Sequence, residues 1–573
     1  MKKIIKYLFI TTLVLVTSCN QDYLDTNNLY EKSLDNYYST PTDIDEAIAG
    51  VYNAIIAPTN NPFSNEHIVA NLLSDVMLGG GGPDDTGAKN TDNFIDPNED
   101  TYRGIWIGTY NGVARANAVI EKTADSDFSL FFDTEQQAID YKNQALGEAY
   151  FMRAFFYFRA AKFFGGMPLI LNIDDPKDVP RSTITETYAQ IATDLKTAIE
   201  MMPAINQSAI PIDRYGHANK WVAEAYLAKA YLYYTGYMTN IEGQATSDLP
   251  LVDGGSLSSG DVITYLNDCM SNSGYSLTPD FRNLWPYSYV NERAGSTVLP
   301  WAENEGLAWV GQDGPSSTFG TGNNETMLAV RYGLGDYGRD PNTQNYSNMV
   351  CLYFAIRDNS MIPFGQGWGW GPVSPKLWSQ WDDADPRKKG SILQLGDAEQ
   401  GTDSYDISKA GDQHTGLINK KYISVQHDGP DGVKGIFYYL YDMQNGDPMQ
   451  LWNANDFILM RFADVLLMHS EISETNDGLN TVRNRAGLGS ISYSLDAIKQ
   501  ERLHEFSFEG LRWFDIVRWG DVDNAFSDTF EVNNSGIDGT YQTMYRTETK
   551  GLLPVPETEI RLLNGSYNQN PGW

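Results

Sequence analysis

The chain has 573 residues, a formal net charge of −33 at pH 7, and 42% hydrophobic and 13% aromatic residues. This is the composition of an ordered globular protein. Nucleic acids and anionic lipid surfaces both reward patches of Lys and Arg, so the acidity argues against them as partners and disfavours a strongly anionic ligand. The length alone would allow several domains, but no low-complexity linker divides the sequence.

Residues 1–18 have the pattern of a bacterial lipoprotein signal peptide. Three lysines precede a short apolar core, and the sequence VTSC ends on Cys19, where such peptides are cleaved and lipidated. We therefore expect a lipidated Cys19 followed by a tether over residues 19–40. A cleaved secretory signal and a plain anchor helix are the alternatives. No later stretch has 18 consecutive apolar residues, so no membrane-spanning helix is predicted there.

The first elements after the tether are two predicted helices. One follows Pro41 and runs to about Ala57, with Thr42 as its N-cap, and the second covers His67–Met77. Residues 79–100 then begin with a run of four glycines and contain six acidic residues, so we predict a loop without regular structure. Loops of this length are usually functional or disordered.

Four further helices are predicted before residue 240, over 103–122, 134–164, 183–202 and 216–238. In 134–164, alanines alternate with Leu, Met and Phe, which suits close packing of helix on helix. No strict 34-residue period is present, so any helical repeats must be divergent.

The composition of the sequence is different between about residues 275 and 450. Gly, Asn, Ser, Asp and aromatic residues dominate, and helical periodicity largely disappears. We predict an irregular, loop-rich portion with short strands at Met327–Tyr332 and Gly435–Leu440 and a short helix at 375–382.

Residues 498–520 combine apolar and aromatic residues with many charges of both signs. Gly510 predicts a break between two helices. Charges in so apolar a sequence must be paired, and we interpret them as a structural ion network, not as catalytic carboxylates, because no nucleophile or His accompanies them at a useful spacing. Opposite charges three apart, which can meet on one helix face, are Arg502–Glu505, Glu509–Arg512, Arg512–Asp515 and Asp515–Arg518.

Four motifs in the last part of the chain carry a family resemblance. They are ILMRFADVLLM at 458–468, NTVRNRAGL at 480–488, the ER…E…FEG…R…D…RWG pattern at 501–520, and LPVP…EI…QNPGW at 553–573. Their content and order resemble the SusD/RagB family of Bacteroidetes outer-membrane nutrient-binding lipoproteins, in which the first motif lies in a helix.

The resemblance implies a mostly α-helical fold. Divergent tetratricopeptide-like helix pairs would form a scaffold, over about 41–270 and 454–520, and the loop-rich portion at about 275–450 would carry much of the ligand surface. Residues 41–573 would form a single domain. The resemblance also implies a protein anchored by lipid at the cell surface, in the outer membrane, that delivers glycan to a SusC-like TonB-dependent transporter. A RagB-like role in peptide uptake is the alternative.

Motifs for catalysis and cofactors are missing from the sequence. There is no HExxH, no G-x-S-x-G, no Walker loop and no dinucleotide fingerprint. Asp96, Asn98 and Asp100 imitate the start of a calcium loop, but Gly and Glu are missing from the later required positions. We therefore predict no enzyme activity, no cofactor and no metal site, with a surface hydrolase as a remote third class. Cys269 and Cys351 are expected to be buried hydrophobes, although they could pair.

Aromatic residues in the non-helical sequence are the predicted ligand contacts. Trp301 and Trp309 lie in an insertion, Pro286–Gly322, relative to the family pattern, and we predict that they stack on sugar rings; the alternative is that they anchor the insertion. The acidity favours a neutral glucan over a polymer of uronic acids. The other predicted ligand residues are Tyr287, Tyr289, Trp368 and Trp370, with Asp84, Asp85 and Asn90 as hydrogen-bond partners from the glycine-rich loop; Trp285, Trp378 and Trp381 are expected to be structural.

Overall fold

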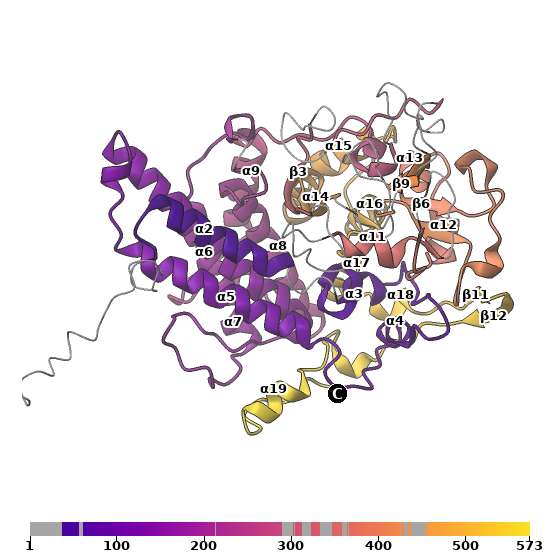
Figure 1. Cartoon of the computed structure of the whole chain (residues 1–573), viewed down its shortest axis with the longest axis horizontal. Helices are drawn as coiled ribbons and strands as arrows, with labels where there is room; N and C mark the ends of the chain where they lie inside the picture. Colours follow the sequence, from indigo (N-terminus) through magenta and orange to yellow (C-terminus); the bar gives the residue numbers. More distant parts are fainter. Residues whose placement is uncertain are drawn as a thin grey trace, which may run out of the picture.

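The structure is a computed structural model that describes residues 37–573, except 57–60, 212–213, 289–301, 303, 312–321, 333–346, 358–363, 365, 424–425, 429–433, 437–452 and 454. A helical scaffold lies on one side of the molecule and short, irregular elements lie on the other (Figure 1). The predicted signal peptide and Cys19 lie outside the described residues. Within the described part of the chain, no helix is both long enough and apolar enough to cross a membrane.

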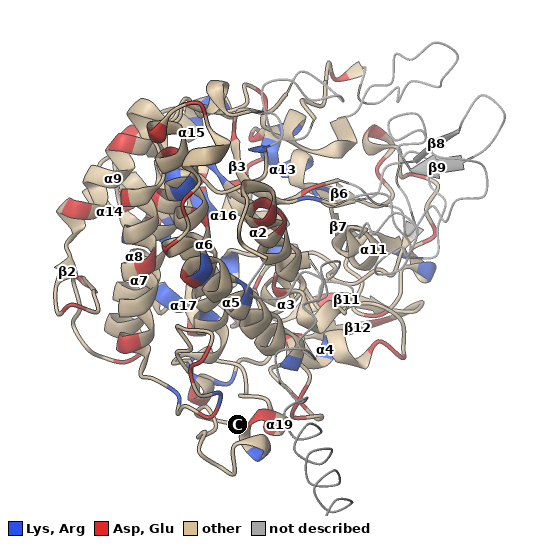
Figure 2. Ribbon diagram, turned by 60° about the vertical axis from the view of Figure 1, so that its left-hand side comes forward, with Lys and Arg blue, Asp and Glu red and all other residues tan. Residues whose placement is uncertain are grey.

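The scaffold is a series of helices in which each packs on the next along the chain from α5 to α9. Acidic positions are scattered over these helices and not gathered on one face (Figure 2). The scaffold helices are α2 (Pro41–Ile56), α5 (Arg103–Ala124), α6 (Glu135–Phe164), α7 (Ile184–Met201), α8 (Lys220–Asn240) and α9 (Ser259–Asn272).

Local sequence explains where these helices begin and how closely they pack. The side chain of Thr134 accepts a hydrogen bond from the backbone of Gln137, whose own side chain accepts from Thr134, and α7 and α9 begin with the same capping box. A Cβ at Gly112 of α5 would lie 2.2 Å from the Phe156 ring, so glycine lets α5 and α6 approach closely. The predicted cap of α2 is wrong, because Thr40 exchanges the capping hydrogen bonds with Asp43.

The loop-rich portion consists of short helices and two-stranded sheets. The first predicted strand is present as β3 (Thr326–Val330), and the predicted helix is α12. β9 (Lys434–Ile436) contains the start of the second predicted strand, whose residues 437–440 lie outside the described residues. The other elements of this portion are α11 (Met349–Phe354), β4 (Ile356–Arg357), β5 (Gln366–Gly367), α12 (Pro375–Gln380), α13 (Pro386–Ser391), β6 (Ile392–Gln394), β7 (Leu417–Asn419) and β8 (Gln426–Asp428).

Residues 457–520 return to the scaffold and link the two sides of the molecule. The family-like motif at 458–468 is not helical throughout: Phe457–Arg461 forms β10, which pairs antiparallel with β3, and the helix begins only at Phe462. The elements that follow are α14 (Phe462–Ser473), α15 (Asp477–Arg485), α16 (Leu495–Phe506), α17 (Arg512–Trp519), α18 (Val522–Ala525), β11 (Phe530–Asn534), β12 (Ile537–Tyr541) and α19 (Glu557–Leu562).

Buried residues from both sides form one continuous hydrophobic core. Cys269 and Cys351 belong to it as free, buried thiols, as predicted, and they do not pair. Trp285 and Trp381 are also buried in it, in agreement with the structural role expected for them.

Candidate ligand-binding site

The glycine run lies against a segment almost 300 positions away in the sequence. Gly80 bridges to Trp370 and Met77 to Val373 in an antiparallel arrangement. The Gly81 amide donates to the Gly369 carbonyl at 2.9 Å, and the Ser374 amide donates to the Val76 carbonyl at 3.0 Å. Because residues 76–81 are extended in this pairing, helix α3 (Glu66–Leu72) ends well before the predicted Met77.

Close approach explains why this run consists of glycines. Gly80 has φ 68°, and a Cβ there would lie 2.3 Å from Pro372 Cδ. A Cβ at Gly81 would lie 2.8 Å from the Trp370 ring, and one at Gly82 would lie 2.5 Å from Arg357 Nη2. At Gly80 and Gly81, which also have positive φ angles, only a residue without a side chain fits. At Gly82 the nearest group is the flexible end of the Arg357 side chain.

Residues 79–100 are not free of regular structure, contrary to the prediction, because helix α4 spans Thr86–Asp92. Asp85 Oδ2 accepts a hydrogen bond from the Gly82 amide at 2.6 Å and closes the turn before the helix. The other end is held by Asp92, which is fully buried and accepts from the Gly79 amide at 2.9 Å and from the Tyr541 hydroxyl at 2.7 Å. Partners distant in sequence therefore stabilise a helix that its composition does not favour.

Two ion pairs border this turn at the surface. Arg357 Nη1 lies 3.4 Å from Asp85 Oδ2 and also donates to the Trp368 carbonyl at 3.1 Å. Lys89 Nζ lies 2.8 Å from Asp412 Oδ2. The side chains of these four charged residues are between 17% and 33% exposed, so they are partly accessible to solvent while the ion pairs hold their positions.

Asp412 is held in its charged form. Burial by itself would raise the pKa of this carboxyl, but the hydrogen bonds from Lys89 and Ser535 and the positive charge of Lys89 outweigh burial and lower it. The 2.7 Å bond from Ser535 comes from the turn between β11 and β12, so the C-terminal hairpin also helps to shape this surface.

The two tryptophans of the Trp368-Gly369-Trp370 segment have different environments. Trp368 is half-buried, with its ring 4.9 Å from Tyr353 in an edge-on arrangement. Trp370 is only 5% exposed and is packed between Tyr353 and Phe63. Trp368 is therefore partly accessible to solvent, whereas Trp370 is part of the core. We call the group formed by Asp85, Lys89, Arg357, Trp368 and Asp412 the Trp368 surface.

The remaining predicted contacts divide into three groups. Asp84 is exposed and Asn90 half-buried at the margin of the Trp368 surface. Tyr287 is fully buried and Trp309 is 7% exposed, so neither presents an open ring face. Trp309 lines a cavity of ≈20 Å³, which is room for about one water molecule and not for a sugar ring. Trp301 and Tyr289 lie outside the described residues.

Sequence reasoning missed Lys89, Arg357 and Asp412 as members of this surface. Lys89 could have been predicted from the sequence, because it belongs to the glycine-rich segment 79–100. Arg357 and Asp412 carry no local signal, since their role depends on pairing with residues more than 250 positions away.

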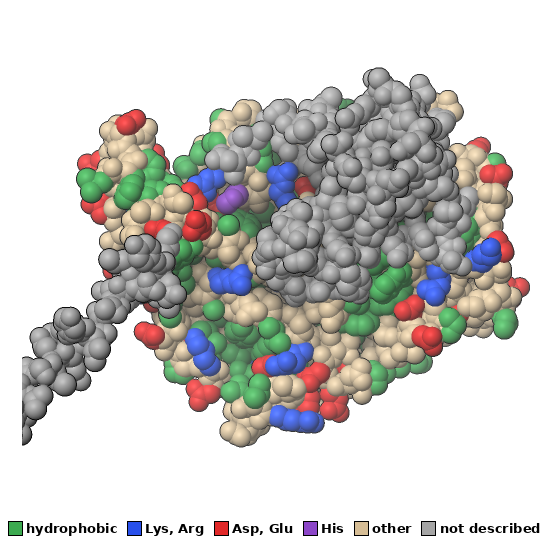
Figure 3. Space-filling view, in the orientation of Figure 1, with side chains coloured by type: hydrophobic (Ala, Val, Ile, Leu, Met, Phe, Trp, Pro, Cys, Tyr) green, Lys and Arg blue, Asp and Glu red, His purple; other side chains and the backbone are tan. Residues whose placement is uncertain are grey.

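The Trp368 surface combines an aromatic face with balanced charges. An indole ring can cover the C–H face of a sugar, and Arg and Asp side chains can donate to and accept from its hydroxyls. On the face of the molecule seen in Figure 3, the Lys and Arg side chains of the described residues stand singly among acidic and apolar ones. No group of three or more His, Cys, Asp or Glu in the described part of the chain could hold a metal ion.

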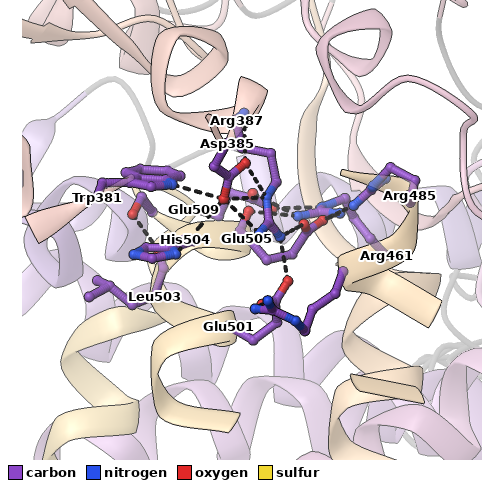
Figure 4. A network of polar contacts seen from close by, with 12 residues as sticks. Trp381, Asp385, Arg387, Arg461, Arg485, Glu501, Leu503, His504, Glu505 and Glu509 are labelled. Carbon is purple, nitrogen blue, oxygen red and sulfur yellow. Dashed lines mark hydrogen bonds and ion pairs between the residues drawn. The ribbon is translucent and has the colours of Figure 1, made fainter. Parts of the chain in front are cut away.

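The densest group of charges lies elsewhere and is buried (Figure 4). Glu505 lies 2.9 Å from Arg387 and 2.7 Å from Arg461 and also pairs with Arg485, and all four side chains are nearly inaccessible to solvent. Burial would raise the pKa of Glu505, but these arginines hold it well below its usual range. Glu501, Glu509, Lys421, Asp385 and Glu325 extend the network.

This network joins the loop-rich portion to the scaffold, in agreement with the structural role predicted for it. The expected pairing within one helix face is mostly wrong, because only Asp515–Arg518 pairs three apart, at 2.9 Å. Arg502 instead pairs with Asp464 and Asp515, and Arg512 pairs with Asp75. The charges lie on different sides of two helices, so they reach partners in other elements.

Fold and surface together define a class: a mostly helical scaffold that carries a surface of aromatic and polar side chains. Comparison with known families gives two matches. A family model described as "Starch-binding associating with outer membrane" matches residues 22–232, and one described as "SusD family" matches residues 373–573. Together the two models span more than half of the chain.

Similar proteins align with most of the chain. "SusD-like protein P2" of Formosa agariphila is 25% identical over an alignment of 597 positions, which covers 99% of this chain and 99% of that one. A "SusD-like protein" of Bacteroides ovatus is 23% identical over 547 residues, covering 89% of this chain and 81% of that one.

Solved structures agree with the fold. A "Laminarin binding SusD-like protein" has a TM-score of 0.68 at 24% identity and covers 94% of this chain and 100% of that one. "Surface glycan-binding protein A" of Bacteroides thetaiotaomicron in complex with laminarihexaose has a TM-score of 0.67 at 19% identity, with 93% and 100% covered.

The chain belongs to the SusD/RagB family. The predicted family and the predicted mostly helical fold are confirmed. It is a binding protein and not an enzyme, because the proteins of this family do not catalyse a reaction.

Proposed function

We propose that the chain binds a neutral oligosaccharide of the glucan class at the Trp368 surface. The observation that carries the proposal is the position of Trp368, a half-buried tryptophan whose backbone carbonyl accepts from Arg357 of the Arg357–Asp85 pair. Asp84 and Asn90 would add hydrogen bonds at the margin. Two proteins of similar fold are named for laminarin or for a complex with laminarihexaose, both neutral glucans, which supports this ligand class.

The balance of charges favours a neutral ligand over an anionic one. Both cations of the surface already have carboxylate partners, and the chain as a whole has a net charge of −33. A polymer of uronic acids would therefore meet repulsion without a free cation to offset it.

The proposal includes the membrane and the transporter. Lipidation at Cys19 would anchor the chain at the cell surface, and the family membership supports delivery of the glycan to a SusC-like TonB-dependent transporter. Labelling cells with radioactive palmitate should mark the wild type and not Cys19→Ser. Affinity purification from detergent-solubilised outer membranes should recover the transporter with the wild-type protein.

Electrophoresis in gels that contain laminarin, starch or alginate tests the ligand. We expect retardation by at least one neutral glucan and none by alginate. Trp368→Ala and Arg357→Ala should each weaken retention at least tenfold, about 1.4 kcal/mol. Trp378→Ala is the matched control, since Trp378 is half-buried in the same portion of the chain but outside the Trp368 surface.

Unchanged retention in both Trp368→Ala and Arg357→Ala would remove the Trp368 surface from the proposal. Co-purified peptides without glycan retention would instead support the RagB-like role. Release of reducing sugar from the gel polysaccharide would contradict a role limited to binding.

A further inference from the structure

A surface cleft of ≈410 Å³ lies between α12, α16 and α18. Its volume falls in the range of small-molecule sites, about 300–1,000 Å³, whereas three other cavities of the described chain measure only ≈20 to ≈30 Å³. Leu377, Leu503 and Ala525 give it an apolar floor. In Figure 4, Leu503 extends away from the carboxylates of the ion network. One side of α16 therefore carries charges of the ion network, and another side lines the cleft.

The rim of the cleft carries amide side chains that are not otherwise engaged. Gln380, Gln500 and Asn524 are exposed and line the cleft. None of their side chains makes a hydrogen bond to another of the described residues. An amide offers both donors and an acceptor, which is what a ligand rich in hydroxyl groups requires.

The charges of the cleft are already paired. Arg512 donates to both oxygens of Asp75 at 2.7 Å, and Lys499 lies 2.6 Å from Asp521. Lys376 pairs with Asp528. An anionic ligand would therefore find no free cation among these lining residues, and the exposed Asp496 would repel it. The chemistry favours a neutral, polyhydroxylated ligand.

The cleft is separate from the Trp368 surface, although two paired segments, residues 76–80 and 370–374, lie next to both. Residues 76–80 pair with residues 370–374. The Gly80–Trp370 end of this pair lies beside Trp368, and the other end continues into Asp75, Val76 and Lys376, which line the cleft.

We propose that this cleft is a second carbohydrate site, which takes a neutral mono- or disaccharide. Hydrogen bonds from Gln380, Gln500 and Asn524 would hold the sugar over the Leu377–Leu503 floor. None of the described residues that line the cleft is aromatic, so it suits a short sugar held by polar contacts and not a long chain held by stacking.

Isothermal titration of the full chain with glucose, maltose, cellobiose and laminaribiose tests the proposal. The titrations use the Trp368→Ala background, so that the Trp368 surface contributes little. We expect at least one of the four sugars to bind. Adding Gln500→Trp, which fills the cleft, should abolish binding, and adding Gln500→Ala should weaken it at least fivefold.

The matched control is Gln244→Trp, at an exposed glutamine away from the cleft, which should leave binding unchanged. The proposal is overturned if none of the four sugars binds to Trp368→Ala, or if both Gln500 variants bind as their parent does. Retention by polysaccharide gels reports on the Trp368 surface independently. Glucan retention that is lost in Trp368→Ala and kept in Gln500→Trp therefore leaves the proposed function standing whatever the outcome at the cleft.

Discussion

Tyr541 donates a hydrogen bond to Asp92 Oδ2 at 2.7 Å. Asp92 is the last residue of α4 and Tyr541 the last of β12, so this contact ties the C-terminal hairpin to the helix beside the Trp368 surface. The same carboxylate oxygen accepts from the Gly79 amide. One buried carboxyl group thus holds three segments together.

Asp92 should make stability depend on pH. Burial raises its pKa to about 7, against the opposing effect of the hydrogen bonds from Tyr541, Gly79 and Thr543. The folded state therefore binds more protons than the unfolded state between about pH 4 and pH 7, and the contribution of this group to stability is lost as pH rises through that window, by up to about 1.4 kcal/mol per unit. Asp92→Asn removes the titration.

Urea unfolding at several pH values from 4.5 to 7.5 measures this effect. The free energy of unfolding of the wild type minus that of Asp92→Asn should decrease as the pH rises. A difference that stays constant over this range would show that Asp92 keeps an ordinary pKa.

The ion network should be sensitive to loss of one partner. Glu505→Gln would leave Arg387, Arg461 and Arg485 with too little negative charge in a buried site, and we expect it to lower the free energy of unfolding by about 3–5 kcal/mol. Glu200→Gln is the control, because its pair with Lys196 is exposed and should contribute less than about 1 kcal/mol. Similar urea midpoints for the two variants would contradict a structural role for the network.

Gly82 should control the position of Arg357. A Cβ at this position would lie 2.5 Å from Arg357 Nη2, so Gly82→Ala should displace the guanidinium group from Asp85. Because only the end of a flexible side chain must move, we expect weaker glucan retention with a change in stability below about 1 kcal/mol. Gly489→Ala, where no atom lies within 4 Å of the added Cβ, should leave both properties unchanged. Normal retention by Gly82→Ala would argue that Arg357 does not contact the ligand.

The two tryptophans around Gly369 should give opposite results on truncation. Trp368→Ala should weaken glucan retention with a smaller loss of stability, because Trp368 is only half-buried. Trp370→Ala should cost about 3–5 kcal/mol of stability, because its ring is buried between Tyr353 and Phe63. Thermal unfolding and gel retention measured on both variants check the assignment, which fails if Trp368→Ala is the more destabilised of the two.

Patterns within short stretches of sequence predicted much of this protein correctly. The helices from α5 to α8 lie close to their predicted limits, because a helix depends on caps and side-chain spacing that are local in the chain. The sequence also predicted that the charges of residues 498–520 form a structural ion network, because charges within an aromatic sequence must be paired when they are buried. The family motifs near the C-terminus are likewise a property of the sequence itself.

The sequence could not show which partners the charges of the ion network have, or which residues form the Trp368 surface. Both depend on contacts between residues that are distant in the chain. Trp368 and Trp370 stand in the same glycine-rich context, yet Trp368 is half-buried and Trp370 is fully buried, because Trp370 pairs with Gly80 and lies against Phe63. In the same way, Tyr287 and Trp309 are buried despite their loop-like surroundings. The sequence shows which residues are neighbours along the chain. The exposure of an aromatic ring depends instead on which residues pack against it, and only the tertiary structure decides which residues those are.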